Sequence, residues 1–344
     1  MKKTLILLTA LSIAASYVSC KKTNNDFKVP TETIRPIAEV SISESKPGSE
    51  LPKGDPVYNL LGYGYDVTAK FDDATSSRAS VIMMASYIKD RPHAIDNSSS
   101  TAFWADSYDG ENAEKLAMAL TNKLNQTQEG KFFKGTIGSF FSEESAFSQK
   151  YVYGFYAEMF QYKRLKVYKG DTENFKNHLS SEFLSDIQAM TPEMLVKKYG
   201  THVLTSIILG AKLNALYQAE TSDQNRLLAQ HAGYDAAMKS TFGMLLSGRL
   251  DPIDSVKLRT ITAPKIAFEA VGGQPGKIKI ITAKKGKVVD TNDWRQSINP
   301  ENAVFIGARE LIPISALIEN AGKKKEVEDY LSLYLKANEV KLKD

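Results

Sequence analysis

Residues that often carry chemistry are few in this 344-residue chain: the histidines are His93, His178, His202 and His231, and Cys20 is the single cysteine. No two histidines have the His-x-x-x-His spacing of a zinc site, and one cysteine cannot complete a Cys/His site. A serine nucleophile assisted by His202 and a distant aspartate is an alternative, but the Gly-x-Ser-x-Gly elbow that would present it is missing. We therefore predict no metal, no cofactor and no enzymatic activity.

The beginning of the chain predicts export. The sequence MKKTLILLTALSIAASYVSC places two lysines before an apolar run from Leu5 to Ala15, and a serine directly before Cys20. An apolar run of this length is typical of a signal peptide and is too short to span a bilayer. The small residue before the cysteine resembles the lipobox of bacterial lipoproteins, which implies that residues 1–19 are a lipoprotein signal peptide and that Cys20 is lipidated. An ordinary secretory leader is the alternative.

Either leader takes the protein out of the cytoplasm. With lipid on Cys20 we expect an exported lipoprotein at the outer membrane or cell surface, or released extracellularly, because several acyl chains hold a protein firmly on a bilayer. Loss of Lys2 and Lys3 with the leader leaves 42 basic against 40 acidic residues. This balance argues against a basic surface for nucleic acid, so no nucleic-acid partner is expected.

The rest of the chain is interpreted as a tether and one folded domain. Residues 20–57 are polar and rich in proline, which predicts an extended tether. The folded part, residues 58–338, begins with an expected strand from Leu61 to Val67, and residues 339–344 form a tail. A helix is expected behind the caps Asp109 and Gly110. The aromatic stretch 131–168 predicts two strands around a Ser/Glu-rich centre.

A helix-to-strand junction follows. Thr191 and Pro192 begin a helix, and Gly200 ends it with a left-handed cap. The next strand, of roughly seventeen residues, is far longer than the usual five or six and implies a large, bent sheet. We expect it to be buried on both faces at first and on one face later, because polar side chains appear at Lys212, Asn214 and Gln218. A helix from Asp223 to Met244 follows, then a strand that Gly272 and Gly273 can bend sharply.

The junction and the motifs after it resemble one family. Tyr199-Gly200-Thr201-His202 resembles the Tyr/Trp-Gly-Thr/Ser-His signature of the membrane attack complex/perforin (MACPF) domain. The segment FEAVGG, with Gly272 and Gly273, resembles that family's strand with paired glycines, and Trp294 with the segments FIGARELIPISALI and VEDYLSLYL resembles its closing strand, turn and final helix. The likeness covers roughly residues 58–338.

The resemblance implies an α+β fold like that of the cholesterol-dependent cytolysins. Its core is a bent, twisted, four-stranded antiparallel sheet flanked by two helical clusters, which in pore-forming relatives unwind into membrane-crossing β-hairpins after oligomerisation. The first cluster would lie around Ser142 to Lys150 and the second around Ala219 to Thr262. Since a hairpin needs about twenty residues plus its turn, the second is long enough and the first is not, unless most of residues 131–150 joins it.

The same resemblance makes His202 a structural histidine at the junction. Gly272 and Gly273 are either a simple bulge or a hinge that lets the sheet open. Family pore formers usually carry a targeting domain after the MACPF domain, whereas this chain ends shortly after the last helix. Targeting would then come from the lipid, a partner or surface loops.

Two functions fit these expectations. The first is a lipid-anchored toxin, plausibly antibacterial, that forms homo-oligomeric pores in a target membrane after meeting that membrane or a surface receptor. The second is a non-lytic cell-surface protein with the same fold, acting in adhesion or recognition.

Overall fold

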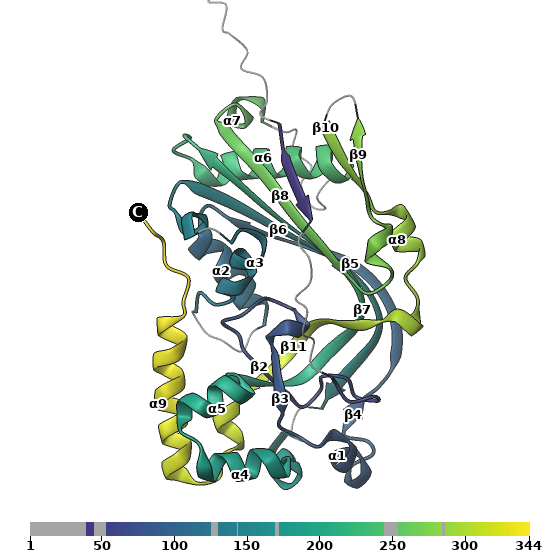
Figure 1. The fold of residues 1–344 in the computed structure, drawn as a ribbon, viewed down its shortest axis with the longest axis vertical. Coiled ribbons are helices and arrows are strands. Elements are labelled where there is room, and N and C mark those ends of the chain that lie inside the picture. The colour runs from purple at the N-terminus through teal and green to yellow at the C-terminus, as the bar shows by residue number, and fades with distance from the viewer. Residues whose placement is uncertain are drawn as a thin grey trace, which may run out of the picture. The chain divides into compact units, whose positions relative to one another are not determined.

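Strand β7 (His202–Thr221) runs through the middle of the main sheet, and the other long strands curve with it (Figure 1). This arrangement is seen in a computed structural model that describes residues 39–44, 53–124, 130–142, 144–168, 172–243, 254–283 and 286–344. Residues 1–38, and with them the predicted signal peptide and Cys20, lie outside the described residues. Of the expected tether, residues 39–44 and 53–57 are described.

Four long strands form the centre of the sheet. They are β5 (Ser99–Gly110), β6 (Tyr151–Val167), β7 and β8 (Ile261–Val271), and each pairs antiparallel with the next along the chain. The α+β class and the antiparallel sheet are confirmed, but the sheet is larger than the four strands expected. Among the described residues it has nine. The additions are β1 (Ser41–Glu44), β2 (Tyr63–Tyr65), β3 (Ser77–Ser80), β4 (Ile95–Asp96) and β11 (Val304–Pro313).

One side of β7 has two partners in succession. Strand β11 pairs with its first half, up to Gly210, and β8 pairs with its second half, from Lys212 onward. The other side of β7 pairs with β6 over nearly its whole length. The expectation that β7 is buried on only one face later in its course is wrong: the side chains of Lys212, Asn214 and Gln218 are all buried.

The segment before β6 differs from the prediction. Residues 96–101, which are rich in Ser, Asn and Asp, lead into β5 and form its beginning. Strand β5 also includes Asp109 and Gly110, so Asn112 is the cap of helix α2 (Ala113–Lys123). Of the two aromatic strands expected over 131–168, only β6 is present among the described residues; the earlier part contains helix α3 (Lys134–Phe140). Phe133, Ile137 and Phe140 are buried and stand at helical spacing, so the many aromatic residues concealed a helical period.

Helices cover both faces of the central strands. Alternate side chains of β6 enter different cores: Tyr153 and Phe155 pack in the core that includes α2 and α3, and Val152 and Tyr156 pack in the core that includes α6 (Arg226–Phe242). The helix expected between Asp223 and Met244 is thus confirmed. Helix α7 (Ser255–Leu258) follows and leads into β8 (Figure 1).

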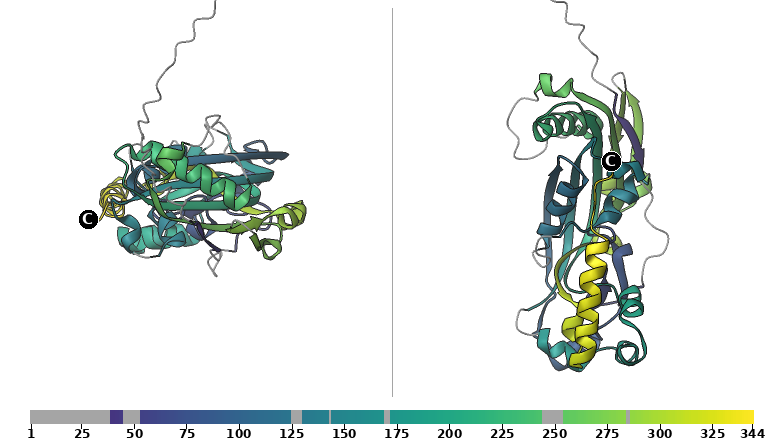
Figure 2. Two further views of the ribbon diagram at one scale, coloured as in Figure 1. Left: turned by 90° about the horizontal axis from the view of Figure 1, so that it is seen from above. Right: turned by 90° about the vertical axis from the view of Figure 1, so that its left-hand side faces the viewer.

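The remaining elements lie at the two ends of the long strands. Helices α4, α5 and α9 gather near β2 and β3, as two views show (Figures 1 and 2), and the β9–β10 hairpin and α8 lie at the β8 side. In the described parts of the chain, no helix is both long and apolar enough to span a membrane. The bounds are α1 (Met84–Asp90), α4 (Ser181–Ala189), α5 (Pro192–Tyr199), β9 (Lys279–Ala283), β10 (Gly286–Asp290), α8 (Asn292–Gln296) and α9 (Ala321–Ala337).

Candidate functional site

The tetrapeptide Tyr199-Gly200-Thr201-His202 joins α5 to β7. Thr191 and Pro192 begin α5 as expected, and Gly200 follows its last residue. The φ angle of Gly200 is +77°, but its ψ of −168° lies outside the left-handed helical region, so the chain turns out of the helix in a more extended conformation than the expected cap. A Cβ atom here would lie 2.7 Å from the backbone of Tyr65. Glycine is therefore required both by conformation and by close approach.

Thr201 connects three segments of the chain. Its backbone N–H and its hydroxyl both donate to the carbonyl of Tyr65, at 3.0 and 3.1 Å. The N–H of Val67 donates to the Thr201 hydroxyl at 3.2 Å, and the N–H of Ile314, just after β11, donates to the Thr201 carbonyl at 3.1 Å. The motif therefore holds β2 and the end of β11 at the beginning of β7.

His202 is buried, and its Nδ1 lies 2.9 Å from the hydroxyl of Thr201. Burial lowers its pKa to about 4, although Asp66 acts in the opposite direction. The ring is neutral at physiological pH and packs at the junction, in keeping with the interpretation of His202 as structural.

Residues 66–76, which we call the β2–β3 loop, carry charged side chains onto the sheet. Lys70 donates to Glu269 of β8 and forms a 3.0 Å ion pair with Asp73. Asn214 of β7 donates to the same Glu269 at 3.1 Å. Glu269 and Asn214 are almost inaccessible to solvent. The loop is thus tied by charge to β8, and Asn214 links the same carboxylate to β7.

The same loop reaches β11. Lys212 of β7 donates to the carbonyl of Asp72. The Asp72 carboxylate accepts from the N–H of Ala308 at 2.9 Å and from Arg309 at 3.1 Å. We call the whole set the buried charge network: Lys70, Asp72, Asp73, Lys212, Asn214, Glu269 and Arg309.

Charges in this network hold one another in place. Burial alone would raise the pKa of Asp73, yet Lys212 and Lys70 keep it below its ordinary value. Burial likewise opposes the charge on Lys70, but Glu269 and Asp73 raise its pKa. At Lys212, which is wholly buried, burial prevails over the neighbouring carboxylates and lowers the pKa. The network is stable as a set and would be costly to break singly.

The chain between β5 and β6, residues 111–150, is the first helical region, and it is attached to the β2–β3 loop. The N–H of Phe71 donates to Thr136 at 2.8 Å, and the N–H of Phe133 donates to the carbonyl of Val67 at 2.8 Å. The ammonium of Lys70 lies 5.5 Å from the centre of the Phe140 ring. The loop therefore lies between α3 and the sheet and bonds to both.

The chain between β7 and β8, residues 222–260, is the second helical region, and α6 is its main element. The Tyr234 ring stacks on Tyr217, with ring centres 5.6 Å apart, and an added Cβ at Gly154 of β6 would lie 2.5 Å from the same ring. On the β5 side, Asp109 accepts from Gln230 at 3.1 Å and lies 3.3 Å from His231. These contacts hold α6 flat against the sheet.

Gly272 and Gly273 lie where β8 ends and β11 takes over as the partner of β7. Their φ angles are +70° and +62°, and a Cβ at Gly272 would lie 2.5 Å from the carbonyl oxygen of Gly210. Trp294 of α8 donates to the Gly272 carbonyl at 3.0 Å. Whether the pair also acts as a hinge stays a prediction.

Helix α8 is fixed to β6 as well. Arg295 donates to both oxygens of Glu158 at 2.8 Å, and the Glu158 side chain is almost completely buried. Such a bidentate pair defines both distance and orientation. The turn at the paired glycines is thus held from two sides, by Trp294 and by this ion pair.

The signature residues and the paired glycines are recognisable in the sequence, whereas the buried charge network was not predicted. The signal was present: Lys212 and Glu269 stand inside otherwise apolar strands, in LGAKLNA and IAFEAV. Buried charges at such positions require partners. In the part of the chain that the structure describes, no group of three or more His, Cys, Asp or Glu residues is placed to hold a metal ion.

The sheet, its two helical connections and the tetrapeptide define a class of protein, that of the perforin-like domains. The MAC/Perforin domain family matches residues 54–342, and the chain belongs to this family. Members of this class form pores or bind partners and are not enzymes. No curated protein matches the sequence.

Two solved bacterial structures have the same fold. One is described as a cell invasion protein with a MAC/Perforin domain from Bacteroides thetaiotaomicron (17% identity, TM-score 0.64, covering 84% of this chain and 64% of that one). The other is GNIP1Aa from Chromobacterium piscinae (16% identity, TM-score 0.58, covering 81% and 56%). The chain thus spans less than two thirds of the length of either.

The buried charge network should contribute to stability only as a set. We expect Glu269→Gln to lower the free energy of unfolding by about 3–5 kcal/mol, because Lys70 stays buried with one carboxylate fewer. Lys70→Met combined with Glu269→Met should recover much of this loss. Urea denaturation followed by circular dichroism measures both. Glu220→Gln is the control, since its pair with Lys150 is largely exposed and should change stability by less than about 1 kcal/mol. Equal losses in the single and double variants would contradict the prediction.

His202 should make the protein less stable in mild acid. Its pKa in the folded state is about 4, below about 6.5 in the unfolded chain, so the unfolded state takes up the proton first. The stability that neutral His202 contributes is therefore fully present above about pH 6.5. As the pH drops to 4, the free energy of unfolding falls by up to about 3 kcal/mol. His202→Gln should show a flatter pH dependence in this window. The exposed His93→Gln should retain the wild-type slope, and an unchanged slope in His202→Gln would contradict the assignment.

Gly272 should tolerate no side chain. We expect Gly272→Ala to lower the free energy of unfolding by about 1–3 kcal/mol, because alanine rarely adopts its φ and the new methyl group would meet the Gly210 carbonyl. Gly276→Ala is the matched control, since no atom lies within 4 Å of its Cβ position. Thermal unfolding of both variants measures the difference; equal midpoints would show that the close approach is not essential.

Proposed function

We propose that this protein is an exported, lipid-anchored pore former that oligomerises on a target membrane and acts as a toxin against other bacteria. One observation carries the proposal: each helical region connects two neighbouring antiparallel strands of the central sheet, β5 with β6 and β7 with β8. Unwinding either region would lengthen an existing hairpin without changing the topology of the sheet. A domain built in this way can convert helices into membrane-crossing strands while its centre stays folded.

Both regions are long enough for this conversion. The first helical region is longer than expected: residues from Ser142 to Lys150 alone would be too short, but the connection between β5 and β6 spans residues 111–150. The second helical region spans residues 222–260. A membrane-crossing hairpin needs about twenty residues plus its turn. Each region, including the first, therefore has enough residues to form a membrane-crossing hairpin.

Family membership and the start of the sequence supply the remaining support. Pore formation and assembly on membranes suit the MAC/Perforin fold, and the two bacterial neighbours share that fold. The leader and Cys20 favour export and lipidation, which would concentrate the protein on a membrane surface. The target membrane or surface receptor, together with further copies of this chain, would be its partners.

A non-lytic role in adhesion or recognition is the second candidate. It is favoured by the lack of strict apolar/polar alternation in the first helical region, where Phe132 and Phe133 are adjacent and Phe140 is followed by Phe141. Strands that face lipid on one side and water on the other normally alternate. In this case both helical regions would stay folded.

A disulfide that ties α6 to the sheet distinguishes the candidates. Gly154→Cys with Tyr234→Cys replaces two residues in direct contact, since a Cβ at Gly154 would lie 2.5 Å from the Tyr234 ring, and neighbouring cysteines of suitable geometry form a disulfide. We make the pair in a Cys20→Ser background, which leaves no other thiol, and measure dye release from liposomes of bacterial lipid. The oxidised protein should release dye at least about tenfold more slowly than the reduced one, since a cross-linked α6 cannot unwind.

Three comparisons make the test decisive. Tyr234→Cys alone should respond little to oxidation, and Cys20→Ser alone reports the effect of losing the anchor. Equal dye release from the oxidised and reduced double variant would exclude unwinding of the second region. No release and no ring-shaped oligomers from the wild-type protein, on liposomes or susceptible cells, would favour the non-lytic role.

A further inference from the structure

We infer that the cavity between α6, the first half of β8 and the β9–β10 hairpin is a binding site for a zwitterionic phospholipid, one acyl chain of which lies inside it. The head group of this ligand carries a phosphate and a primary ammonium. The site goes beyond the proposed function, since binding there does not require pore formation. Three features carry the assignment: the size of the cavity, the separation of its apolar and polar ends, and the two charges at its polar end.

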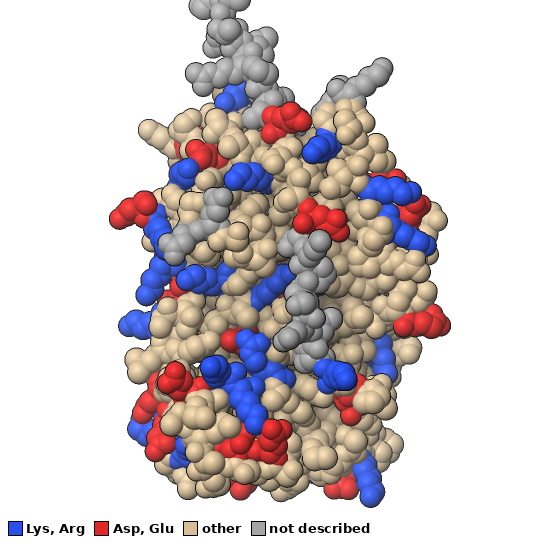
Figure 3. All heavy atoms as spheres, viewed as in Figure 1, with Lys and Arg blue, Asp and Glu red and all other residues tan. Residues whose placement is uncertain are grey.

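The surface around this part of the molecule has no excess of one charge. Basic and acidic side chains are interspersed over the upper part of the face that Figure 3 shows, which β1, β8 and α6 occupy in Figure 1. Such a surface does not concentrate simple anions or simple cations. A ligand with balanced charges is therefore favoured.

The cavity has the size of a small-molecule site. Its volume is about 740 Å³, within the range of about 300–1,000 Å³ that is usual for such sites. On the α6 side it is lined by Gly233, Ala236 and Ala237, whose side chains are absent or short. A Cβ atom at Gly233 would lie 2.3 Å from the Tyr217 hydroxyl, so the helix approaches the sheet closely there. The small residues of α6 thus leave a space that a ligand chain can fill.

The wall opposite α6 is shaped by a bulge in β8. The register between β7 and β8 shifts between Gln218 and Glu220, where β8 has one residue more than β7. Within the bulge, Ala263 has a φ of +46°, which residues with a side chain rarely adopt. Bulges re-aim side chains, and strained residues of this kind cluster at functional sites. Here the bulge brings the buried Pro264 onto the cavity wall.

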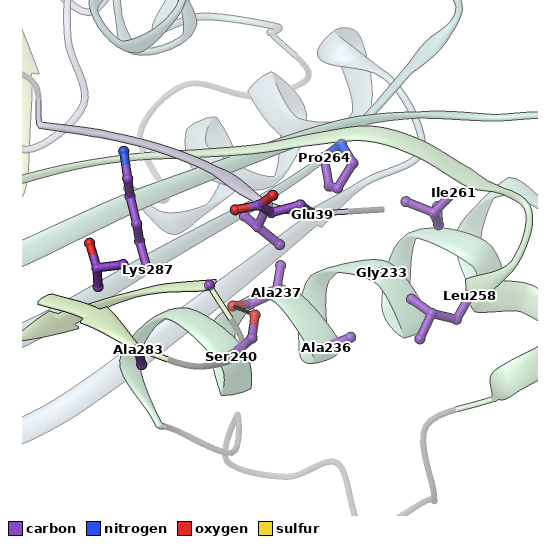
Figure 4. Close-up of a pocket in the computed structure, with 13 residues that line it drawn as sticks. Glu39, Gly233, Ala236, Ala237, Ser240, Leu258, Ile261, Pro264, Ala283 and Lys287 are labelled. Atoms are coloured by element: carbon purple, nitrogen blue, oxygen red, sulfur yellow. Dashed lines mark hydrogen bonds between the residues drawn. The ribbon is translucent and has the colours of Figure 1, made fainter. Parts of the chain in front are cut away.

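The cavity has an apolar end and a polar end. Figure 4 shows Leu258 and Ile261 together at one end and Lys287 at the other, with Glu39 and Ser240 nearer to Lys287. Leu258 and Ile261 are buried, whereas Glu39 and Lys287 are exposed. An elongated ligand with an apolar chain and a polar head matches both ends. Its chain would lie along α6 and its head beside the β9–β10 hairpin.

The polar end carries one charge of each sign. Glu39 and Lys287 line it, and neither has an ion-pair partner among the residues that the structure describes. In Figure 4 the Glu39 carboxylate points toward the side on which Lys287 lies. A ligand ammonium beside Glu39 and a ligand phosphate beside Lys287 would satisfy both charges through charge-assisted hydrogen bonds.

Other amphiphiles fit the polar end less well. A fatty acid would pair with Lys287 but bring its carboxylate near Glu39, and an alkylamine would bring its ammonium near Lys287; like charges placed together are unfavourable. A choline head group has both charges, but quaternary ammonium groups are recognised by aromatic rings. None of the described residues that line the cavity is aromatic. A primary ammonium, which can donate hydrogen bonds to a carboxylate, is therefore preferred.

A lipid in this site would contact three elements at once: α6, β8 and the β9–β10 hairpin. Since α6 is the main element of the second helical region, the bound lipid would hold that region on the sheet and resist its unwinding. This consequence, unlike the site itself, rests on the proposed function.

Calorimetric titration of the purified Cys20→Ser protein measures binding. The probe is lysophosphatidylethanolamine, a single-chain lipid, used below its micelle concentration. Glycerophosphoethanolamine lacks the chain and should bind at least about a hundredfold more weakly, because each buried methylene group contributes to affinity. Lysophosphatidic acid lacks the ammonium, and lysophosphatidylcholine has a quaternary one. Each should bind about fivefold more weakly, as expected for the loss of one partly exposed ion pair.

Three variants and one control locate the site. Ala236→Leu places a larger side chain in the cavity and should weaken binding at least about tenfold. Ala337→Leu, the same change at an exposed position of α9, should bind like the parent protein. Glu39→Gln should bind lysophosphatidylethanolamine and lysophosphatidic acid equally, whereas Lys287→Gln should bind both more weakly than the parent does. Circular dichroism shows that each variant is folded.

Two results would overturn the assignment directly. Equal affinity of Ala236→Leu and its parent for the probe would overturn the site. Equal affinity of the parent for lysophosphatidylethanolamine and lysophosphatidic acid would overturn the head group. Binding to the Cys20→Ser protein but not to the wild-type protein would show that the chain's own acyl groups fill the cavity, and would overturn a free phospholipid as its occupant.

Further readouts separate the site from the proposed function. Slower hydrogen exchange of the α6 amides in the bound protein would support the site, whether or not liposomes release dye. Binding of the probe by a protein that forms no pores would refute the proposed function and leave the site intact. If the protein does form pores, bound lipid should slow dye release, and unchanged release would show that the lipid does not hold α6.

Discussion

The structure depends on one constraint: β7 must be paired along its whole length although no single strand on one side of it is long enough. Strand β8 pairs with one half and β11 with the other, and they meet where Gly210 and Gly272 approach each other too closely for side chains. At the beginning of β7, Thr201 hydrogen-bonds to Tyr65 of β2 and to Ile314, just after β11. The signature motif therefore lies at the beginning of β7, and the paired glycines lie where the partner of β7 changes from β11 to β8.

The buried charge network attaches the β2–β3 loop to the sheet, and hydrogen bonds at Phe71 and Phe133 attach that loop to the first helical region. Buried ion pairs add little net stability compared with apolar packing, since desolvation offsets their attraction, but they define geometry closely. Opening of this region to water would hydrate charges such as Lys70 and Glu269, and hydration would offset part of the lost attraction. An apolar contact gains nothing comparable on exposure. The network thus fixes the loop that α3 contacts, while hydration of its charges would offset part of the cost of opening.

The fold class was predictable because the family's motifs stand at chain positions where backbone geometry permits few residues, as at Gly200 and Gly272. Local sequence patterns predicted secondary structure less well where tertiary contacts determine it. Strand β5 was missed because its sequence is polar and its side chains are only partly buried, and α3 was missed because aromatic content outweighed a helical period. The partners of Lys212 and Glu269 could not be deduced, because the residues that neutralise them lie far away in the sequence.

Unwinding of a helical region would need partners for the strands that it forms, and this requirement has a physical reason. Strands released in a single copy would expose backbone groups without partners, which is unfavourable in lipid and prone to aggregation in water. Each helical region, however, lies between two strands that are already paired, β5 with β6 and β7 with β8. A strand formed beside either pair could therefore extend an existing ladder. In the folded protein, the Tyr217–Tyr234 stack and the hydrogen bond from Phe71 to Thr136 hold the two helical regions on the sheet.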